Sequence, residues 1–119
     1  MSKVDTSDAE AKSTNGCWVK VYEHVNFEGE SVVFYGPEEV RNCSDWKWPD
    51  GGTLGDDIGS LVTGPNAWFI GYEDENFEDK RVHVGPSTQV RDLNHVVDGM
   101  NDNIDSYKLY ATKPPEWPS

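Results

Sequence analysis

The chain contains two copies of one short pattern, and this repeat limits the possible folds more than any other feature of the sequence. Residues 22–29 read Tyr-Glu-His-Val-Asn-Phe-Glu-Gly, and residues 72–79, 50 positions later, read Tyr-Glu-Asp-Glu-Asn-Phe-Glu-Asp. Residues 56–61 (Asp-Asp-Ile-Gly-Ser-Leu) recur 46 positions later as residues 102–107 (Asp-Asn-Ile-Asp-Ser-Tyr). Because four strands alone rarely close a core, two copies of one supersecondary unit predict a single domain made of two equivalent halves.

Short segments rich in β-branched and aromatic residues fill the middle of the chain, each bounded by Gly, Pro, Asn or Asp. No segment keeps a helical period, so we expect an all-β fold. The Gly64-Pro65 junction divides a first half, about residues 17–65, from a second half, about residues 66–112. Residues 43–55 predict a long loop with room for one helical turn. The expected strands are residues 18–24, 30–36, 60–64, 67–73, 80–85 and 106–111.

Each copy of the pattern predicts a folded-over hairpin. Two aromatic rings stack across the tight bend, and the last residue of the pattern adopts a positive φ. Glycine suits that position in the first copy, and aspartate is among the few other residues that tolerate left-handed geometry. The residues concerned are Tyr22, Phe27 and Gly29 in the first copy and Tyr72, Phe77 and Asp79 in the second.

The charge of the chain narrows the class of partner. Ten basic residues against 22 acidic ones give a net charge of −12 and a pI near 4.4. Nucleic acids and anionic membrane surfaces are recognised by clustered Lys and Arg, so we expect neither as a partner. Divalent cations are the natural partners of such a surface, although acidic surfaces also serve solubility alone.

The two ends of the chain differ in composition from the middle. Residues 1–16 are polar and predict a disordered arm, and residues 113–119 predict an extended Pro-rich tail. The first 16 residues lack the hydrophobic stretch of a secretory signal, and no apolar run reaches the ~20 residues of a membrane span. We expect a cytoplasmic protein, with secretion or a cell-surface location left open.

The sequence contains no recognisable catalytic motif, so we do not expect an enzyme. The three histidines have no paired spacing, and there is no nucleophile motif or phosphate-binding glycine loop. Cys17 and Cys43 do not have zinc-site spacing; they are either free thiols or one disulfide, depending on the compartment. Trp46 and Trp48 are either packing aromatics, the interpretation we favour, or a sugar-binding platform.

Over residues 17–112 the repeated pattern resembles the Greek key motifs of the βγ-crystallins, particularly the microbial single-domain members that bind calcium. The resemblance implies a sandwich of two four-stranded antiparallel sheets built from two Greek key motifs. It also implies a calcium signature once in each half, before the last strand: two Asn or Asp residues, two variable residues, Ser or Thr, then Ser. These segments are residues 55–60 and 101–106.

The resemblance further implies two Ca²⁺ ions between the paired motifs, each held by oxygen atoms from both halves. Calcium takes six to eight such oxygens from carboxylates, carbonyls, hydroxyls and water. Ile58 and Ile104 should anchor the two loops in the core, and Ser60 and Ser106 should close the hairpins rather than bind metal. The implied ligands are the side chains of Asp56, Asp102 and Asp105, the carbonyls of Asp57 and Asn103, and a carbonyl near Val25 and near Glu75.

Two departures from the signature predict unequal sites. Gly59 lacks the hydroxyl of the fifth position, and Gly55 replaces the first Asn or Asp, whereas Asp105 offers a carboxylate in place of a hydroxyl. We therefore expect a monomeric calcium-binding domain with a structural or stress-related role and one weak site. A purely structural domain with negligible calcium affinity, and an interaction or inhibitor module on the same fold, are the alternatives. The identity of any protein partner stays open.

Overall fold

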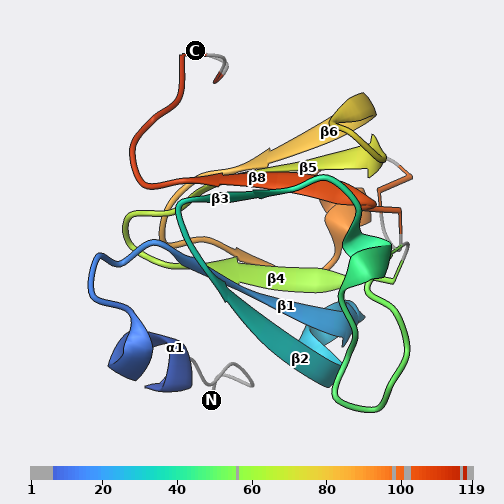
Figure 1. Cartoon of the computed structure of the whole chain (residues 1–119), viewed down its shortest axis with the longest axis horizontal. Coiled ribbons are helices and arrows are strands. Elements are labelled where there is room, and N and C mark those ends of the chain that lie inside the picture. The colour runs from blue at the N-terminus through green and yellow to red at the C-terminus, as the bar shows by residue number, and fades with distance from the viewer. Residues whose placement is uncertain (1–6, 56, 98, 101–102, 116, 118–119) are drawn as a thin grey trace.

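Two four-stranded antiparallel sheets pack face to face in the computed structural model, which describes residues 7–55, 57–97, 99–100, 103–115 and 117 (Figure 1). The prediction of an all-β sandwich is confirmed. One sheet has the order β2-β1-β4-β7, with β1 Trp18–His24, β2 Glu28–Tyr35, β4 Ser60–Thr63 and β7 Gln89–Val90. The other has the order β3-β8-β5-β6, with β3 Glu38–Val40, β8 Ser106–Tyr110, β5 Trp68–Asp74 and β6 Glu78–Val84.

Each half contributes three strands to one sheet and one strand to the other. Strand β3 of the first half pairs with β8, and β7 of the second half pairs with β4. This exchange is the long return connection of a Greek key, and it makes both sheets depend on both halves. The two halves therefore form one folding unit.

The exchanged strands were not expected from the sequence, because β3 has three residues and β7 has two. The other six strands lie within a few residues of the expected segments. The long loop after β3 begins with one 3₁₀ turn, η2 (Cys43–Asp45), and Lys47 pairs with Thr53 inside it. Two further 3₁₀ turns are η1 (Val25–Phe27) and η3 (Leu93–His95).

The core lies between the sheets and is filled by the inward residues of the alternating strands. Val19 and Val21 of β1 and Phe69 of β5 are fully buried in one cluster. Tyr107 of β8 is also buried there, and its hydroxyl donates to Glu38 Oε1 at 2.7 Å. Burial, together with this bond to Glu38, raises the pKa of the Tyr107 phenol far above its ordinary value.

Both cysteines are buried free thiols in the same core. Burial raises the pKa of the Cys17 thiol, because the thiolate would lose its hydration there. A protonated buried cysteine behaves as a small hydrophobic residue.

The ends of the described chain are packed against the sandwich. Residues Ser7–Lys12 form a short helix, α1, whose Ala9 is fully buried against Trp18 and Val62. This finding differs from the expected disordered arm over residues 7–16; residues 1–6 lie outside the described residues. Beyond β8, Pro114 is buried and Trp117 contacts Trp68. Among the described residues, none of the helices combines the length and apolar character needed to cross a bilayer.

Candidate functional site

Both hairpins bend as the repeated pattern predicts. The ring centroids of Tyr22 and Phe27 lie 5.6 Å apart, and those of Tyr72 and Phe77 also lie 5.6 Å apart. The bends place two consecutive residues in the left-handed region: φ is 60° and 59° at Asn26 and Phe27, and 60° and 61° at Asn76 and Phe77. The positions after the bends are also left-handed, with φ 81° at Gly29 and 68° at Asp79.

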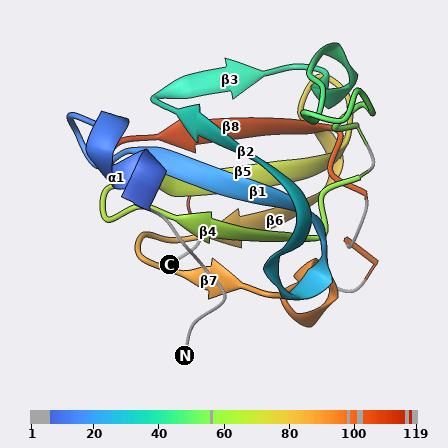
Figure 2. The ribbon, with the colours of Figure 1, turned by 90° about the horizontal axis from the view of Figure 1, so that it is seen from below.

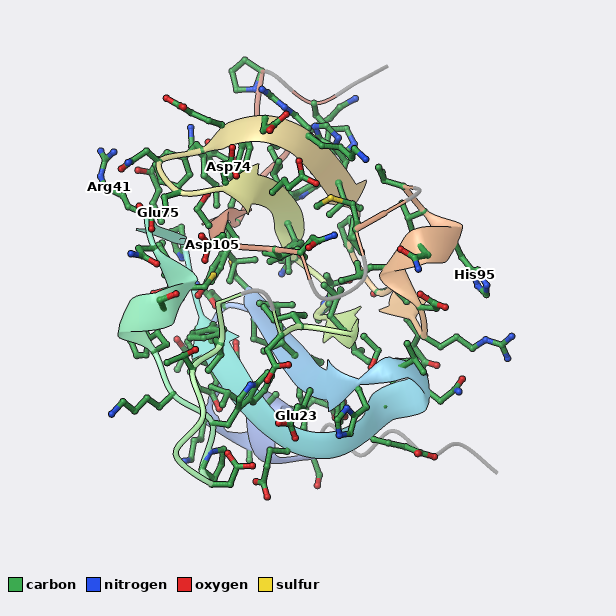
Figure 3. The ribbon with its side chains drawn as sticks, turned by 90° about the vertical axis from the view of Figure 1, so that its right-hand side faces the viewer. Glu23, Arg41, Asp74, Glu75, His95 and Asp105 are labelled. Atoms are coloured by element: carbon green, nitrogen blue, oxygen red, sulfur yellow. The ribbon has the colours of Figure 1, made fainter. Side chains whose placement is uncertain are left out.

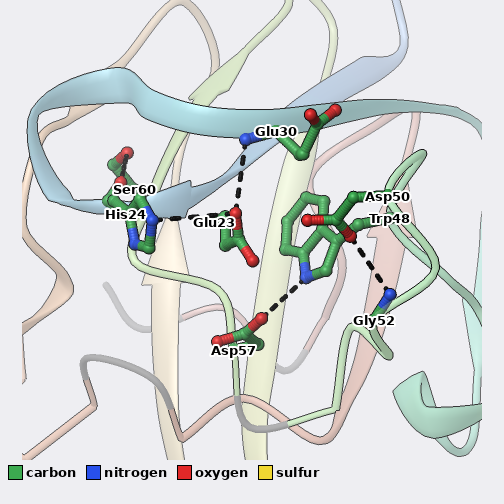
Figure 4. Close-up of polar contacts among 8 residues, drawn as sticks. All are labelled: Glu23, His24, Glu30, Trp48, Asp50, Gly52, Asp57 and Ser60. Carbon is green, nitrogen blue, oxygen red and sulfur yellow. Dashed lines mark hydrogen bonds and ion pairs between the residues drawn. The ribbon is translucent and has the colours of Figure 1, made fainter.

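A buried serine closes each bend from the last strand of the same half. Ser60 Oγ donates to the carbonyl of His24 at 2.6 Å (Figure 4). It also accepts from the backbone N–H of Phe27 at 3.0 Å. Ser106 Oγ makes the same two contacts in the second half, with Asp74 O at 2.6 Å and Phe77 N at 3.1 Å. Both hydroxyls are therefore occupied by the hairpins and serve the fold.

Reciprocal backbone hydrogen bonds join each bend to the other half. The N–H of Asn26 donates to Arg91 O at 2.8 Å, and the N–H of Asn76 donates to Arg41 O at 2.9 Å. These bonds hold each bend against a loop of the opposite half. Both halves therefore contribute backbone to the region around each bend.

A polar pocket of about 330 Å³ lies at the second bend, lined by Asp74, Glu75, Asn76, Glu78 and Asp105. Figure 3 shows Asp74, Glu75 and Asp105 grouped at this end of β5 and β6, with Glu23 on the other sheet. Oδ1 of Asp105 is a buried oxygen atom. The pocket is thus rich in oxygen atoms that can coordinate a metal, and hard cations prefer such ligands.

The loop of the first half reaches Asp105. A Cβ atom placed on Gly55 would lie 2.8 Å from Asp105 Oδ1 and would overlap Ser44 Oγ. A side chain at position 55 would therefore require both neighbours to move, which gives a physical reason for glycine there. The contact brings the start of one signature segment next to the fifth position of the other.

The side chains of Asp57 and Asn103, which follow the two undescribed aspartates, are already engaged. Asp57 Oδ2 accepts from Trp48 Nε1 at 2.9 Å (Figure 4), and Asn103 Nδ2 donates to the carbonyl of Gly99. Their backbone carbonyls are therefore the better candidate ligands, the role that the resemblance implies for them. Trp48 itself is 2% exposed, whereas Trp46 is 44% exposed, so the two indoles do not form a shared platform.

At the first bend, backbone atoms leave no room for a side chain at the fifth signature position, Gly59. A Cβ atom placed on Gly59 would lie 2.7 Å from the carbonyl carbon of His24 and 2.9 Å from the nitrogen of Val25. A side chain at position 59 would therefore collide with the backbone of the first bend, whereas position 105 of the second half carries a carboxylate in the polar pocket. Of the implied ligands at this end, the Val25 carbonyl is described, and no side-chain oxygen comes from position 59.

Two of the implied ligands, Asp56 and Asp102, lie outside the described residues. Within the described ranges, no group of three or more His, Cys, Asp or Glu side chains converges as a ready metal site. The oxygen-lined pocket at Asp105 has the ligand chemistry that a hard cation prefers. Asp74 and Glu78 also line this pocket, and the four acidic residues within segment 73–78 are the signal in the sequence that could have identified them.

Comparison with known proteins gives a consistent result. No protein-family model matches the chain. Spherulin-3A from Physarum polycephalum is 33% identical over 88 residues, which make up 74% of this chain and 77% of that protein. A solved structure from work on the evolution of the eye lens βγ-crystallin domain fold matches with a TM-score of 0.70 and 28% identity, covering 85% of this chain and 92% of that one. A βγ-crystallin from an archaeon matches with a TM-score of 0.62 and 25% identity, covering 81% and 100%.

Proposed function

Because the chain belongs to the βγ-crystallin superfamily, we propose that it is a calcium-binding domain with a structural or stress-related role and no enzymatic activity. A bound Ca²⁺ ion would neutralise acidic groups and cross-link the two halves. In a chain of net charge −12, removal of that repulsion stabilises the folded state.

The pocket at Asp105 is the observation that carries the proposal. It gathers acidic residues of the second bend and the Asp105 carboxylate, next to Gly55 of the first signature segment. Asp57 and Asn103 keep their side chains engaged elsewhere and leave carbonyl oxygens, which are normal calcium ligands. We assign the stronger site to this end of the sandwich and the weaker one to the bend beside Gly59.

Calcium titration of the whole chain tests the proposal. A ligand that binds only the folded state adds about 2.7 kcal/mol of stability at a hundredfold excess over its dissociation constant. We expect calcium to raise the melting temperature and calorimetry to show one strong and one weak binding event. Asp105→Asn, which keeps the shape of the side chain and removes its charge, should remove most of the strong event. Asp102→Ala should also reduce the thermal shift.

Asp50→Asn is the matched control. Asp50 is exposed, and its Oδ1 accepts from the N–H of Gly52 at 3.1 Å, a bond that the oxygen of an asparagine preserves (Figure 4). Its calcium response should equal that of the unmodified chain. If millimolar calcium leaves the melting temperature of the unmodified chain unchanged, the proposal fails.

A purely structural domain is the second candidate function, and Gly59 favours it. With backbone filling the fifth position of the first half, one of the two sites loses an oxygen that the signature normally supplies. If neither site binds calcium in the titration, the domain is a structural member of the superfamily whose stability rests on packing alone.

A further inference from the structure

Three cationic side chains lie on the aromatic rings of the second bend. The guanidinium of Arg81, on β6, lies 5.1 Å from the centroid of the Tyr72 ring. Phe77 has two such contacts, with Lys108 Nζ of β8 at 4.7 Å and with the Arg41 guanidinium at 5.2 Å. A cation within about 6 Å of a ring centroid is attracted by the negative face of the ring. Arg41, Arg81 and Lys108 are called the cationic collar below.

The cationic collar lies beside the acidic pocket. Phe77, which two of the cations contact, directly precedes Glu78 of the pocket lining. The carbonyl of Arg41 accepts from the N–H of Asn76 at 2.9 Å, and Figure 3 shows Arg41 next to Glu75. Contacts within one tight bend bring the opposite charges to about the Debye length, roughly 8 Å at physiological ionic strength, where their attraction is only partly screened.

The first bend has a different set of charges on the same aromatic frame. The ring centroids of the aromatic pair lie 5.6 Å apart at both bends, so the spacing of the rings does not depend on the collar. Four carboxylates of the second bend correspond to one in the first, and two of the three collar positions are uncharged there, although Lys20 contacts Tyr22. Asp74, Glu75, Glu78 and Asp105 correspond to His24, Val25, Glu28 and Gly59, and Arg41, Arg81 and Lys108 correspond to Arg91, Ser31 and Val62. The collar thus accompanies the bend that has the carboxylates.

We propose that the cationic collar is the built-in counter-charge of the second bend, which stabilises the calcium-free fold and limits the calcium affinity of the adjacent pocket. The inference rests on the calcium-binding role proposed above. Without calcium, the collar offsets the repulsion among the carboxylates, in a chain whose net charge is −12. With calcium bound, the same cations repel the ion. The collar therefore weakens calcium binding and makes the fold depend less on calcium.

Removal of one collar charge at a time tests the proposal in the full-length chain. Lys108→Gln and Arg81→Gln should each lower the melting temperature in EDTA. Each should also tighten the strong calcium-binding event about two- to fivefold, the effect of one partly screened charge on a divalent ion. In saturating calcium the loss of melting temperature should be smaller than in EDTA. Lys108→Arg keeps the charge and should match the unmodified chain in both measurements.

Lys12→Gln and Arg91→Gln are the matched controls, because each removes one positive charge from an exposed position. Lys12 ends α1, which Figures 1 and 2 show at the opposite end of the sandwich from the bend between β5 and β6. Arg91 is the first-half counterpart of Arg41, and its carbonyl accepts from the N–H of Asn26 at 2.8 Å. Both controls should keep the affinity of the strong event unchanged.

A salt series separates the charge of the collar from its packing on the rings. In EDTA, the loss of melting temperature in Lys108→Gln and Arg81→Gln should shrink as NaCl rises from about 0.01 to 1 M, because the Debye length falls from about 30 to 3 Å. A loss that does not change with salt, or calcium binding no tighter than in the unmodified chain, overturns the proposal. If the unmodified chain binds no calcium, the proposed function fails, and the salt series alone decides whether the collar is a counter-charge.

Discussion

The two halves of the domain share the bonds that close their hairpins but differ in the residues that line their bends. Ser60 and Ser106 make the same pair of hydrogen bonds, with distances that agree within 0.1 Å. At the fifth signature position, however, the first half has Gly59 packed on backbone and the second has Asp105 in a polar pocket. The fold therefore constrains the serines. The fifth signature position is less constrained, because it carries a metal-coordinating oxygen in one half and no side chain in the other.

The loop before the last strand also differs between the halves. The spacing of the repeat falls from 50 to 46 residues, so the first half has four residues more in this loop. Trp48 fills that longer loop, is almost fully buried and donates to Asp57. The extra residues are thus stabilised by packing and by one hydrogen bond.

The largest expected effects test the equivalence of the serines. Ser60→Ala and Ser106→Ala each leave a backbone carbonyl and an N–H without their partner in a buried bend. We expect each substitution to cost about 2–3 kcal/mol in the free energy of unfolding, measured by urea denaturation.

The control for the serines removes a hydroxyl from the surface. Thr14→Ala, at an exposed position between α1 and β1, should change the free energy of unfolding by less than about 0.5 kcal/mol. The losses from Ser60→Ala and Ser106→Ala should agree with each other within about 0.5 kcal/mol, the usual size of a surface effect. Clearly unequal losses in the free energy of unfolding would show that the two serines do not contribute equally to closing their hairpins.

The hairpins were predictable because their determinants are local. Aromatic spacing and a residue that tolerates positive φ are visible in residues 22–29 and 72–79, and the repetition removes the ambiguity of a single copy. Strands β3 and β7 were not predictable, because two or three residues carry no period and each pairs with a strand of the other half. Their existence depends on tertiary pairing.

Helix α1 was missed for a related reason. Its six residues have no apolar face of their own, and the small Ala9 is the residue that is buried on Trp18. Likewise the calcium signature covers residues 101–106 and says nothing of Asp74 and Glu78, which the bend brings to the same pocket as Asp105. In both cases the contacts depend on tertiary packing of the sandwich, which local sequence patterns do not predict.

A smaller effect is expected from giving the first half the side chain that it lacks. In Gly59→Ser, the new Cβ would lie within 3.0 Å of three backbone atoms of His24 and Val25. We expect a loss of about 1–3 kcal/mol, as for an overpacked core, and no gain in calcium affinity. Gly52→Ser is the control, because a Cβ there meets no atom closer than 3.6 Å. Tighter calcium binding by Gly59→Ser, with stability unchanged, would show that the bend has room for a ligand.

The smallest expected effects concern the left-handed residue after each bend. Gly29 has φ 81°, and a Cβ there would lie 2.7 Å from a ring carbon of His24, an exposed side chain that can move aside. Gly29→Ala should therefore cost about 1–2 kcal/mol, mainly from the left-handed backbone. In Asp79→Gly, relief of the same strain at φ 68° is offset by the extra chain entropy of glycine, so the change should stay below about 0.5 kcal/mol. Thermal denaturation of both variants measures the difference, and equal losses would mean that Asp79 contributes a specific contact instead of only tolerating the bend.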